Sequence, residues 1–157
     1  MPLSYIGIGS NLGDSAAIVV SALACLGELG EVRARSSLYR TRPWGRLDQP
    51  TFVNAVALLD TRESPHGLLA ALQALESCLG RTPGERYGPR VIDLDILTYD
   101  ALVVATADLQ IPHPRLSERA FVLVPLAEID GDYAPLRDAL ARNELASVER
   151  LETGLAG

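Results

Sequence analysis

The most informative stretch for predicting the fold is a short expected strand that carries two aspartates. Residues 91–99 read Val91-Ile92-Asp93-Leu94-Asp95-Ile96-Leu97-Thr98-Tyr99, a run of β-branched and aliphatic residues between Gly88-Pro89 and Asp100. The run is too short for a capped helix, so a strand is predicted. Side chains alternate along a strand, which places the aliphatic groups on one face and the two aspartates together on the other, roughly 6–7 Å apart.

Two carboxylates at this spacing suit metal-assisted chemistry on phosphate. They can share a pair of divalent ions about 3.5–4 Å apart that clamp the attacking and leaving oxygens, and oxygen ligands favour Mg²⁺. The alternative is an ordinary Asp-x-Asp pair facing solvent. Like charges on one face repel unless they are compensated. Arg81, Arg86 and Arg90 lie just before the acids in a segment rich in Gly and Pro, which favours a ligand site.

The elements on either side of this strand indicate the fold class. Strands are expected over residues 3–9, 31–40 and 51–60, and helices over residues 15–29, from Pro65 with Ser64 as the N-cap, and from Pro135 to about Arg150. The order β-α-β-β-α-β predicts a ferredoxin-like α+β fold, a mostly antiparallel sheet with helices packed on its faces. A chain of 157 residues suits one domain, residues 1–157.

The amino-acid composition argues against several classes of partner and of chemistry. A net charge of −6 and a pI near 4.9 argue against nucleic acid or an anionic membrane as a partner, and no run of about 18 apolar residues is present. We therefore expect a cytoplasmic monomer that binds small molecules. All fourteen basic residues are Arg. The absence of Lys excludes a P-loop and Schiff-base chemistry, so phosphate must be held by Arg, backbone N–H groups and metal.

Two further groups of residues indicate a ligand. Phe52 and Asn54 share one face of the strand over 51–60, and the only other phenylalanine is Phe121. Aromatic rings and an amide that donates and accepts suit a flat heterocycle, although ordinary core packing of both rings is the alternative. His113 lies between two prolines, and Arg119 follows six residues later. Two interpretations of the imidazole stay open: a structural role and a contact with phosphate.

Five blocks occur in order along the chain: Ile8–Gly13; Tyr39–Thr41 with Asp48–Pro50; Phe52–Val56; Arg86–Arg90 with Asp93–Ile96; and Ile111–Pro114 with Arg119 and Phe121. Together they closely resemble the 6-hydroxymethyl-7,8-dihydropterin pyrophosphokinases of folate biosynthesis. The resemblance covers residues from about 3 to 130. It implies a ferredoxin-like fold and transfer of the β,γ-diphosphate of ATP, the co-substrate, to the pterin hydroxymethyl group with release of AMP.

The resemblance also implies roles for individual residues. Two Mg²⁺ ions would be bound by Asp93 and Asp95. The ATP phosphates would be contacted by Arg81, Arg90, His113 and Arg119, and the nucleoside would lie near Gln73, Glu76 and Ile96. The pterin would stack between Phe52 and Phe121, with its edge read by Asn54 and by the backbone at Thr41, Pro43 and Trp44, and Tyr87 would approach it. The expected catalytic residues are Asp95, Arg81 and Arg90.

Two positions depart from the family pattern, and other functions stay open. Tyr87 stands where the family often has Trp, and Pro83 where many relatives have a basic residue, so weaker closure of this segment is expected. The enzymatic alternatives are adenylyl transfer and simple γ-phosphoryl transfer. A non-catalytic module that binds RNA or a small ligand is the alternative from another class, and the few aromatics and acidic pI disfavour RNA.

Overall fold

The computed structural model describes residues 2–41, 50–81 and 91–151. Its first half contains β1 (Leu3–Ser10), α1 (Ser15–Cys25), the 3₁₀ turn η1 (Leu26–Glu28), β2 (Gly30–Arg35), β3 (Tyr39–Thr41), β4 (Phe52–Thr61) and α2 (Pro65–Cys78). The second half contains β5 (Asp93–Ile96), β6 (Val104–Ala105), β7 (Gln110–Ile111), η2 (Leu116–Glu118), α3 (Ala120–Ile129), η3 (Gly131–Tyr133), α4 (Ala134–Asp138), α5 (Arg142–Ala146) and β8 (Val148–Arg150).

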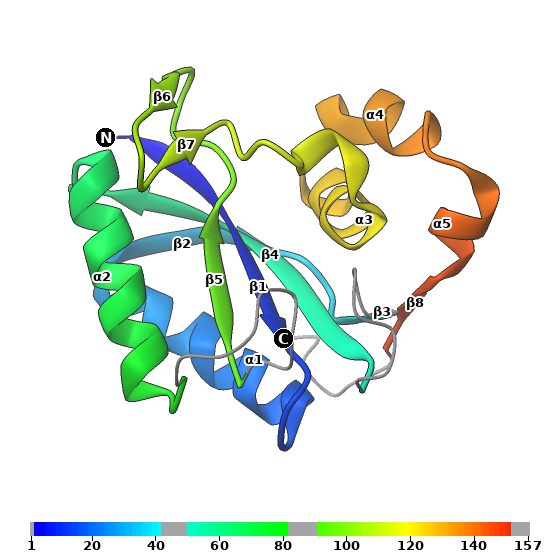
Figure 1. Cartoon of the computed structure of the whole chain (residues 1–157), viewed down its shortest axis with the longest axis horizontal. Coiled ribbons are helices and arrows are strands. Elements are labelled where there is room, and N and C mark those ends of the chain that lie inside the picture. The colour runs from blue at the N-terminus through cyan, green and yellow to red at the C-terminus, as the bar shows by residue number, and fades with distance from the viewer. Residues whose placement is uncertain (1, 42–49, 82–90, 152–157) are drawn as a thin grey trace.

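The main sheet has the order β5-β1-β4-β3-β8, and β2 also pairs with β4. Every described pairing is antiparallel. This is the predicted ferredoxin-like α+β arrangement, in which the first and last strands of the β-α-β-β-α-β unit lie side by side (Figure 1). None of the described helices is long and apolar enough to span a bilayer.

The two principal helices begin where their capping residues predict. The Ser64 side chain accepts a hydrogen bond from the Gly67 N–H at 3.0 Å, and Pro65 occupies the first turn of α2. The Asp14 side chain accepts from the Ala17 N–H at the start of α1. α1 is shorter than the predicted helix over 15–29, because the chain tightens into η1 before β2 begins at Gly30.

The sheet separates two apolar clusters. Ile6, Ile8, Leu94 and Ile96 face α1 and α2 in the larger cluster, whereas α3 packs on the opposite face through Leu123 and its neighbours. Figure 1 shows α1 and α2 on one side of the strands, with α3 and α4 on the other. The strand alternation therefore places helices on both faces, as predicted.

Two sequence predictions of local structure were wrong. The strand expected over 31–40 is divided into β2 and β3, because the Ser36 hydroxyl accepts from the Val56 N–H at 2.9 Å between them. The helix expected from Pro135 to Arg150 is replaced by two short helices and β8. β8 pairs with β3, so strand pairing at the edge of the sheet prevails over helix propensity in this Ala- and Leu-rich segment.

Candidate active site

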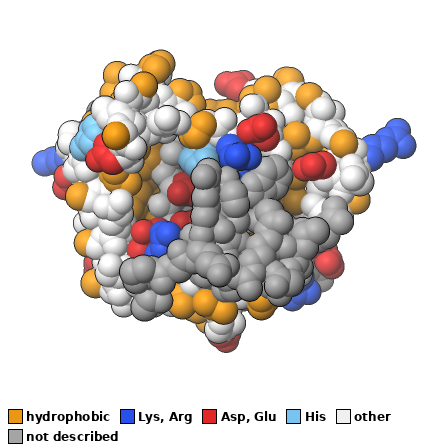
Figure 2. Space-filling view, in the orientation of Figure 1, with side chains coloured by type: hydrophobic (Ala, Val, Ile, Leu, Met, Phe, Trp, Pro, Cys, Tyr) orange, Lys and Arg blue, Asp and Glu red, His pale blue; other side chains and the backbone are white. Residues whose placement is uncertain are grey.

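Several of the side chains predicted to be functional meet at one end of the sheet, where three neighbouring strands align. Gly9 on β1 pairs with Asn54 on β4 and with Asp93 on β5, and Gly7 pairs with Asp95. Directly paired residues point to the same face. The Asn54 amide and both acids therefore lie on one face, on either side of a strand that carries only glycines there. In Figure 2, acidic, Arg and His side chains gather near the middle of the face shown.

The acid pair has the geometry that the strand alternation predicted. Asp93 and Asp95 are partly exposed, while Leu94 between them is buried in the core. Although Asp95 as a whole is partly exposed, its carboxyl group is surrounded by protein, and this desolvation raises the pKa of Asp95 to about 8, with a smaller contribution from the Asp93 carboxylate that Arg119 partly opposes. Two crowded carboxylates of this kind are stabilised when a cation binds between them.

These oxygen donors fit Mg²⁺, but they do not form a complete cage. Across residues 2–41, 50–81 and 91–151, no group of three or more His, Cys, Asp or Glu side chains is placed to hold a metal ion. Mg²⁺ is commonly held by one or two carboxylates together with substrate phosphates. The described donor set therefore suits a metal ion that arrives with a nucleotide.

Arg81 lies directly beside this pair. Its Nη1 donates to Glu76 Oε2 at 2.6 Å and to Asp93 Oδ1 at 3.1 Å. Burial raises the pKa of Glu76, while the Leu94 N–H and Arg81 favour its charged form. The guanidinium thus compensates part of the negative charge at this end of the sheet.

His113 and Arg119 approach the same acids from the segment that precedes α3. Burial, and then the charge of Arg119, lower the pKa of His113, so the ring is neutral at pH 7. His113 Nδ1 accepts from the Arg115 N–H at 3.1 Å, which leaves the proton of the neutral ring on Nε2. The Ile111–Pro112 peptide bond just before it is cis.

Phe121 adjoins this basic group at the start of α3. The Arg119 guanidinium lies over the Phe121 ring, 5.3 Å from its centroid, which is a cation–π distance. The ring is partly buried against the α3 cluster. The segment from Pro112 to Phe121 therefore presents an imidazole, a guanidinium and an aromatic ring in succession.

Asn54 is held in a defined orientation. Its side chain is buried, and Oδ1 accepts from the Thr41 hydroxyl at 2.6 Å. Phe52 lies two residues away on the same face. The structure thus brings Thr41, Phe52 and Asn54 together at one end of β3 and β4. The strand pattern predicted the shared face of Phe52 and Asn54, and the family resemblance implied the nearby Thr41.

Two further predicted residues lie at the margin of the site. The Ile96 side chain belongs to the core under α1 and α2, so only its backbone is available to a ligand on the acidic face. Gln73 is exposed on α2, one turn before Glu76. Pro43, Trp44, Tyr87 and Arg90 fall outside the described residues, as does Pro83.

The sequence interpretation missed several supporting contacts. A Cβ atom on Gly9 would lie 2.8 Å from Asn54 Nδ2, so this position admits only glycine without displacing the amide. The Asn11 side chain donates to the Pro50 carbonyl at 3.0 Å. Glu128 on α3 accepts from the Tyr39 hydroxyl at 2.5 Å and from Ser37. A glycine inside a strand is a recognisable sign of close approach, but the long-range pairs have no local signal.

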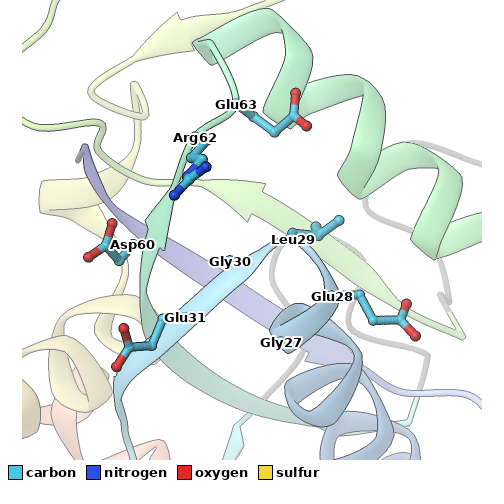
Figure 3. Close-up of a pocket in the computed structure, with 8 residues that line it drawn as sticks. All are labelled: Gly27, Glu28, Leu29, Gly30, Glu31, Asp60, Arg62 and Glu63. Atoms are coloured by element: carbon cyan, nitrogen blue, oxygen red, sulfur yellow. The ribbon is translucent and has the colours of Figure 1, made fainter.

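A separate pocket opens at the other end of the sheet. Figure 3 shows its lining, which comes from η1, the start of β2, the end of β4 and the residues next to these elements: Gly27, Glu28, Leu29, Gly30, Glu31, Asp60, Arg62 and Glu63. Asp60 is six residues beyond Asn54 on β4, about 20 Å along the strand. The pocket contains none of the predicted site residues. The end of the sheet that carries Asn54, Asp93 and Asp95 is therefore the better candidate for the active site.

The fold and the candidate site are those of a class: an α+β enzyme for phosphate transfer, with an acid pair, arginines, and an aromatic ring beside an amide on one face. The model of the family described as 7,8-dihydro-6-hydroxymethylpterin-pyrophosphokinase (HPPK) matches residues 5–131. This chain belongs to that family. It is therefore an ATP-dependent pyrophosphokinase of folate biosynthesis, which confirms the sequence prediction.

Similar proteins support this assignment over nearly the whole chain. A 2-amino-4-hydroxy-6-hydroxymethyldihydropteridine pyrophosphokinase from Methylorubrum extorquens is 46% identical over 97% of this chain and 100% of its own length. The enzyme of the same name from Pseudomonas aeruginosa is 42% identical over 94% and 95%. A bifunctional folate synthesis protein from Pisum sativum is 45% identical over 80% of this chain, which spans 25% of that protein.

Solved structures independently support the fold. A Plasmodium falciparum HPPK-DHPS crystal structure with pterin and p-hydroxybenzoate superposes with a TM-score of 0.73 at 14% identity, over 95% of this chain and 47% of that one. An HPPK-DHPS structure in complex with substrates gives a TM-score of 0.70 at 13% identity, over 88% and 45%. The chain thus spans a little under half of these solved chains.

Proposed function

We propose that the glycine-lined end of the sheet is where the β,γ-diphosphate of ATP passes to the hydroxymethyl group of 6-hydroxymethyl-7,8-dihydropterin. The observation that carries the proposal is the register that places Asn54 and Asp93 on the two sides of Gly9. An amide for the heterocycle and an acid for the metal-bound phosphates then flank a strip of bare backbone. Two substrates can lie there against each other.

The acid pair forms the metal-binding side of this site. Asp93 and Asp95 would hold two Mg²⁺ ions, which when bound neutralise the triphosphate and polarise the reacting phosphorus. The support is the raised pKa of Asp95, caused by burial and by Asp93, since a bound cation stabilises the charged form. The described residues leave the remaining coordination positions to phosphate and water.

The basic residues form the phosphate-binding side. The Nε2–H group of His113 would donate a hydrogen bond to a phosphate oxygen, and Arg119 and Arg81 would compensate the charge of ATP. Arg81 already reaches Asp93, so a phosphate beside that acid lies within its range. Arg90 is assigned the same role from the resemblance. Phosphoryl-type transfer depends mostly on such positioning and electrostatic stabilisation.

The pterin would lie on the Asn54 side. Because Asn54 Oδ1 accepts from Thr41, its Nδ2 group is available to donate to an acceptor on the heterocycle. Phe52 and Phe121 would stack on its two faces, with the backbone at Thr41, Pro43 and Trp44 and the Tyr87 ring completing the pocket. Gln73 and the Ile96 backbone would lie toward the nucleoside. We also propose a single domain and a monomer.

Product analysis tests the reaction. The protein is incubated with ATP, Mg²⁺ and 6-hydroxymethyl-7,8-dihydropterin, and the nucleotides are separated by chromatography. Formation of AMP together with the pterin diphosphate is expected, in equal amounts and only when the pterin is present. ADP would indicate γ-phosphoryl transfer, and free pyrophosphate would indicate adenylyl transfer; either product in place of AMP would overturn the proposal.

A further inference from the structure

Glu76 makes an unusual set of contacts for a residue on a helix. It lies in the last turn of α2, and its side chain is only 8% exposed. One oxygen, Oε2, accepts from Arg81 Nη1 at 2.6 Å and from the Leu94 N–H at 2.8 Å. A single buried carboxylate therefore joins the end of α2 to β5.

The end of α2 explains why Arg81 is available to Glu76. Gly80 has a φ of +102°, and its N–H bonds to the Ser77 carbonyl at 3.1 Å. The Arg81 N–H bonds to the Glu76 carbonyl at 3.0 Å. These two bonds form a Schellman motif, which turns the chain back over the last helical turn. Arg81 is thus bound to Glu76 through both its backbone and its side chain.

The contact with β5 has a separate cause. Among the described strands, β5 pairs only with β1 and so forms an edge of the sheet. A strand at an edge presents N–H groups that no neighbouring strand accepts. Glu76 accepts the N–H of Leu94, the residue between Asp93 and Asp95. The segment of β5 between the two acids is thereby tied to α2.

We propose that Glu76 is a positioning residue that holds Arg81 and the acid pair in the arrangement that receives the ATP phosphates. It acts through Arg81 and the Leu94 N–H, and not by touching the nucleotide. This inference rests on the function proposed above. It assigns the carboxylate a different part from the nucleoside contact that the family resemblance implies.

The sign of the effect of a substitution separates this role from simple electrostatics. ATP is a polyanion, so removal of a nearby negative charge strengthens its binding if Glu76 contributes nothing except its charge. Removal of a positioning contact weakens binding, because Arg81 is no longer held near the phosphates. Glu76→Gln is the suitable variant, since the amide oxygen can still accept from Leu94 while the ion pair with Arg81 is lost.

A double-mutant cycle tests the proposal. The affinity for the Mg²⁺ complex of α,β-methylene-ATP is measured by titration calorimetry in four proteins: unaltered, Glu76→Gln, Arg81→Ala and the double variant. Glu76→Gln is expected to weaken binding about tenfold, the scale of one charge-assisted hydrogen bond. In the Arg81→Ala background the same substitution should cause no further weakening.

Three other measurements complete the test. Ser77→Ala, an exposed neighbour on α2, should bind the analogue like the unaltered protein. The KM for the pterin should be unchanged in Glu76→Gln, whereas the KM for ATP should rise. Tighter or unchanged binding by Glu76→Gln, or an equal weakening in both backgrounds, would overturn the positioning role alone. Failure of the unaltered protein to bind the analogue would overturn this inference together with the proposed function.

Discussion

The two faces of the sheet use the same strands for different purposes. On the face covered by α1 and α2, alternate residues of β1, β4 and β5 are fully buried aliphatic groups in one continuous cluster. On the other face, α3 packs against only part of the strands, and the part beyond it carries Asn54, Asp93 and Asp95. Residues proposed to act in catalysis and residues that stabilise the core therefore alternate along the same strand. Substitutions at adjacent positions should have opposite effects on activity and on stability.

The largest effect is expected on the polar face. Asp95→Asn should lower kcat by at least about 10³-fold, because a metal ligand and its charge are lost where charge develops. Stability at pH 8 should be unchanged or raised, since burial disfavours the ionised carboxylate in the metal-free protein. Rate measurements check the expected loss of kcat, and urea unfolding at pH 8 checks the stability. Retained turnover would contradict the metal assignment.

The next effect belongs to the neighbouring residue on the apolar face. Ile96→Ala should reduce the free energy of unfolding by about 2–5 kcal/mol, because Ile96 is 4% exposed and leaves a cavity. The KM for each substrate should change little in the fraction that stays folded. Urea unfolding followed by circular dichroism measures the loss. If Ile96→Ala were as stable as the unaltered protein but inactive, the two faces of the sheet would not differ in the way proposed.

The glycines of β1 sharpen the comparison within the polar face. Gly9→Ala should raise the KM for the pterin by about tenfold, equivalent to about 1.4 kcal/mol, because the new methyl group displaces Asn54 Nδ2. Gly7→Ala is the matched control, since its Cβ would meet only the Leu97 side chain at 3.4 Å. Steady-state kinetics with varied pterin distinguishes them. Equal KM values in the two variants would contradict the close approach at Gly9.

A smaller effect is expected at Thr41. Thr41→Val removes the hydroxyl that donates to Asn54 Oδ1 and should cost about 1 kcal/mol of pterin binding, because the amide orientation is no longer fixed. Thr41→Ser keeps the hydroxyl and should restore most of the affinity. Fluorescence titration with the pterin provides the measurement. The assignment fails if Val and Ser bind alike.

The smallest effect concerns pH. The folded state holds the pKa of His113 below its ordinary value of 6.5, so below pH 6.5 the unfolded state takes up the proton more readily and stability falls. His113→Asn removes this contribution and should lose less stability than the unaltered protein between pH 7 and pH 5. Urea midpoints at each pH report it. Parallel losses in the two proteins would show that His113 is not the cause.

The sequence predicted the features that are encoded locally. The period-two alternation over 91–99 was enough to place Asp93 and Asp95 on one face, and Ser64-Pro65 was enough to begin α2. It failed where tertiary pairing decides the outcome: residues 148–150 form β8 because β3 offers an unpaired edge. The contacts of Glu128 with Tyr39 and of Asn11 with Pro50 join residues 89 and 39 positions apart. The sequence around each of these residues contains no local pattern that predicts its distant partner.

The register around Gly9 has a further consequence for how the substrates meet. Asn54 and Asp93 stand on the two strands that flank β1, about 10 Å apart at two interstrand spacings. That separation is set by backbone hydrogen bonds and not by side-chain rotamers, so it resists thermal fluctuation and most substitutions. In the proposed site, the sheet therefore fixes the distance between the group that faces the pterin and the group that faces the metal-bound phosphates.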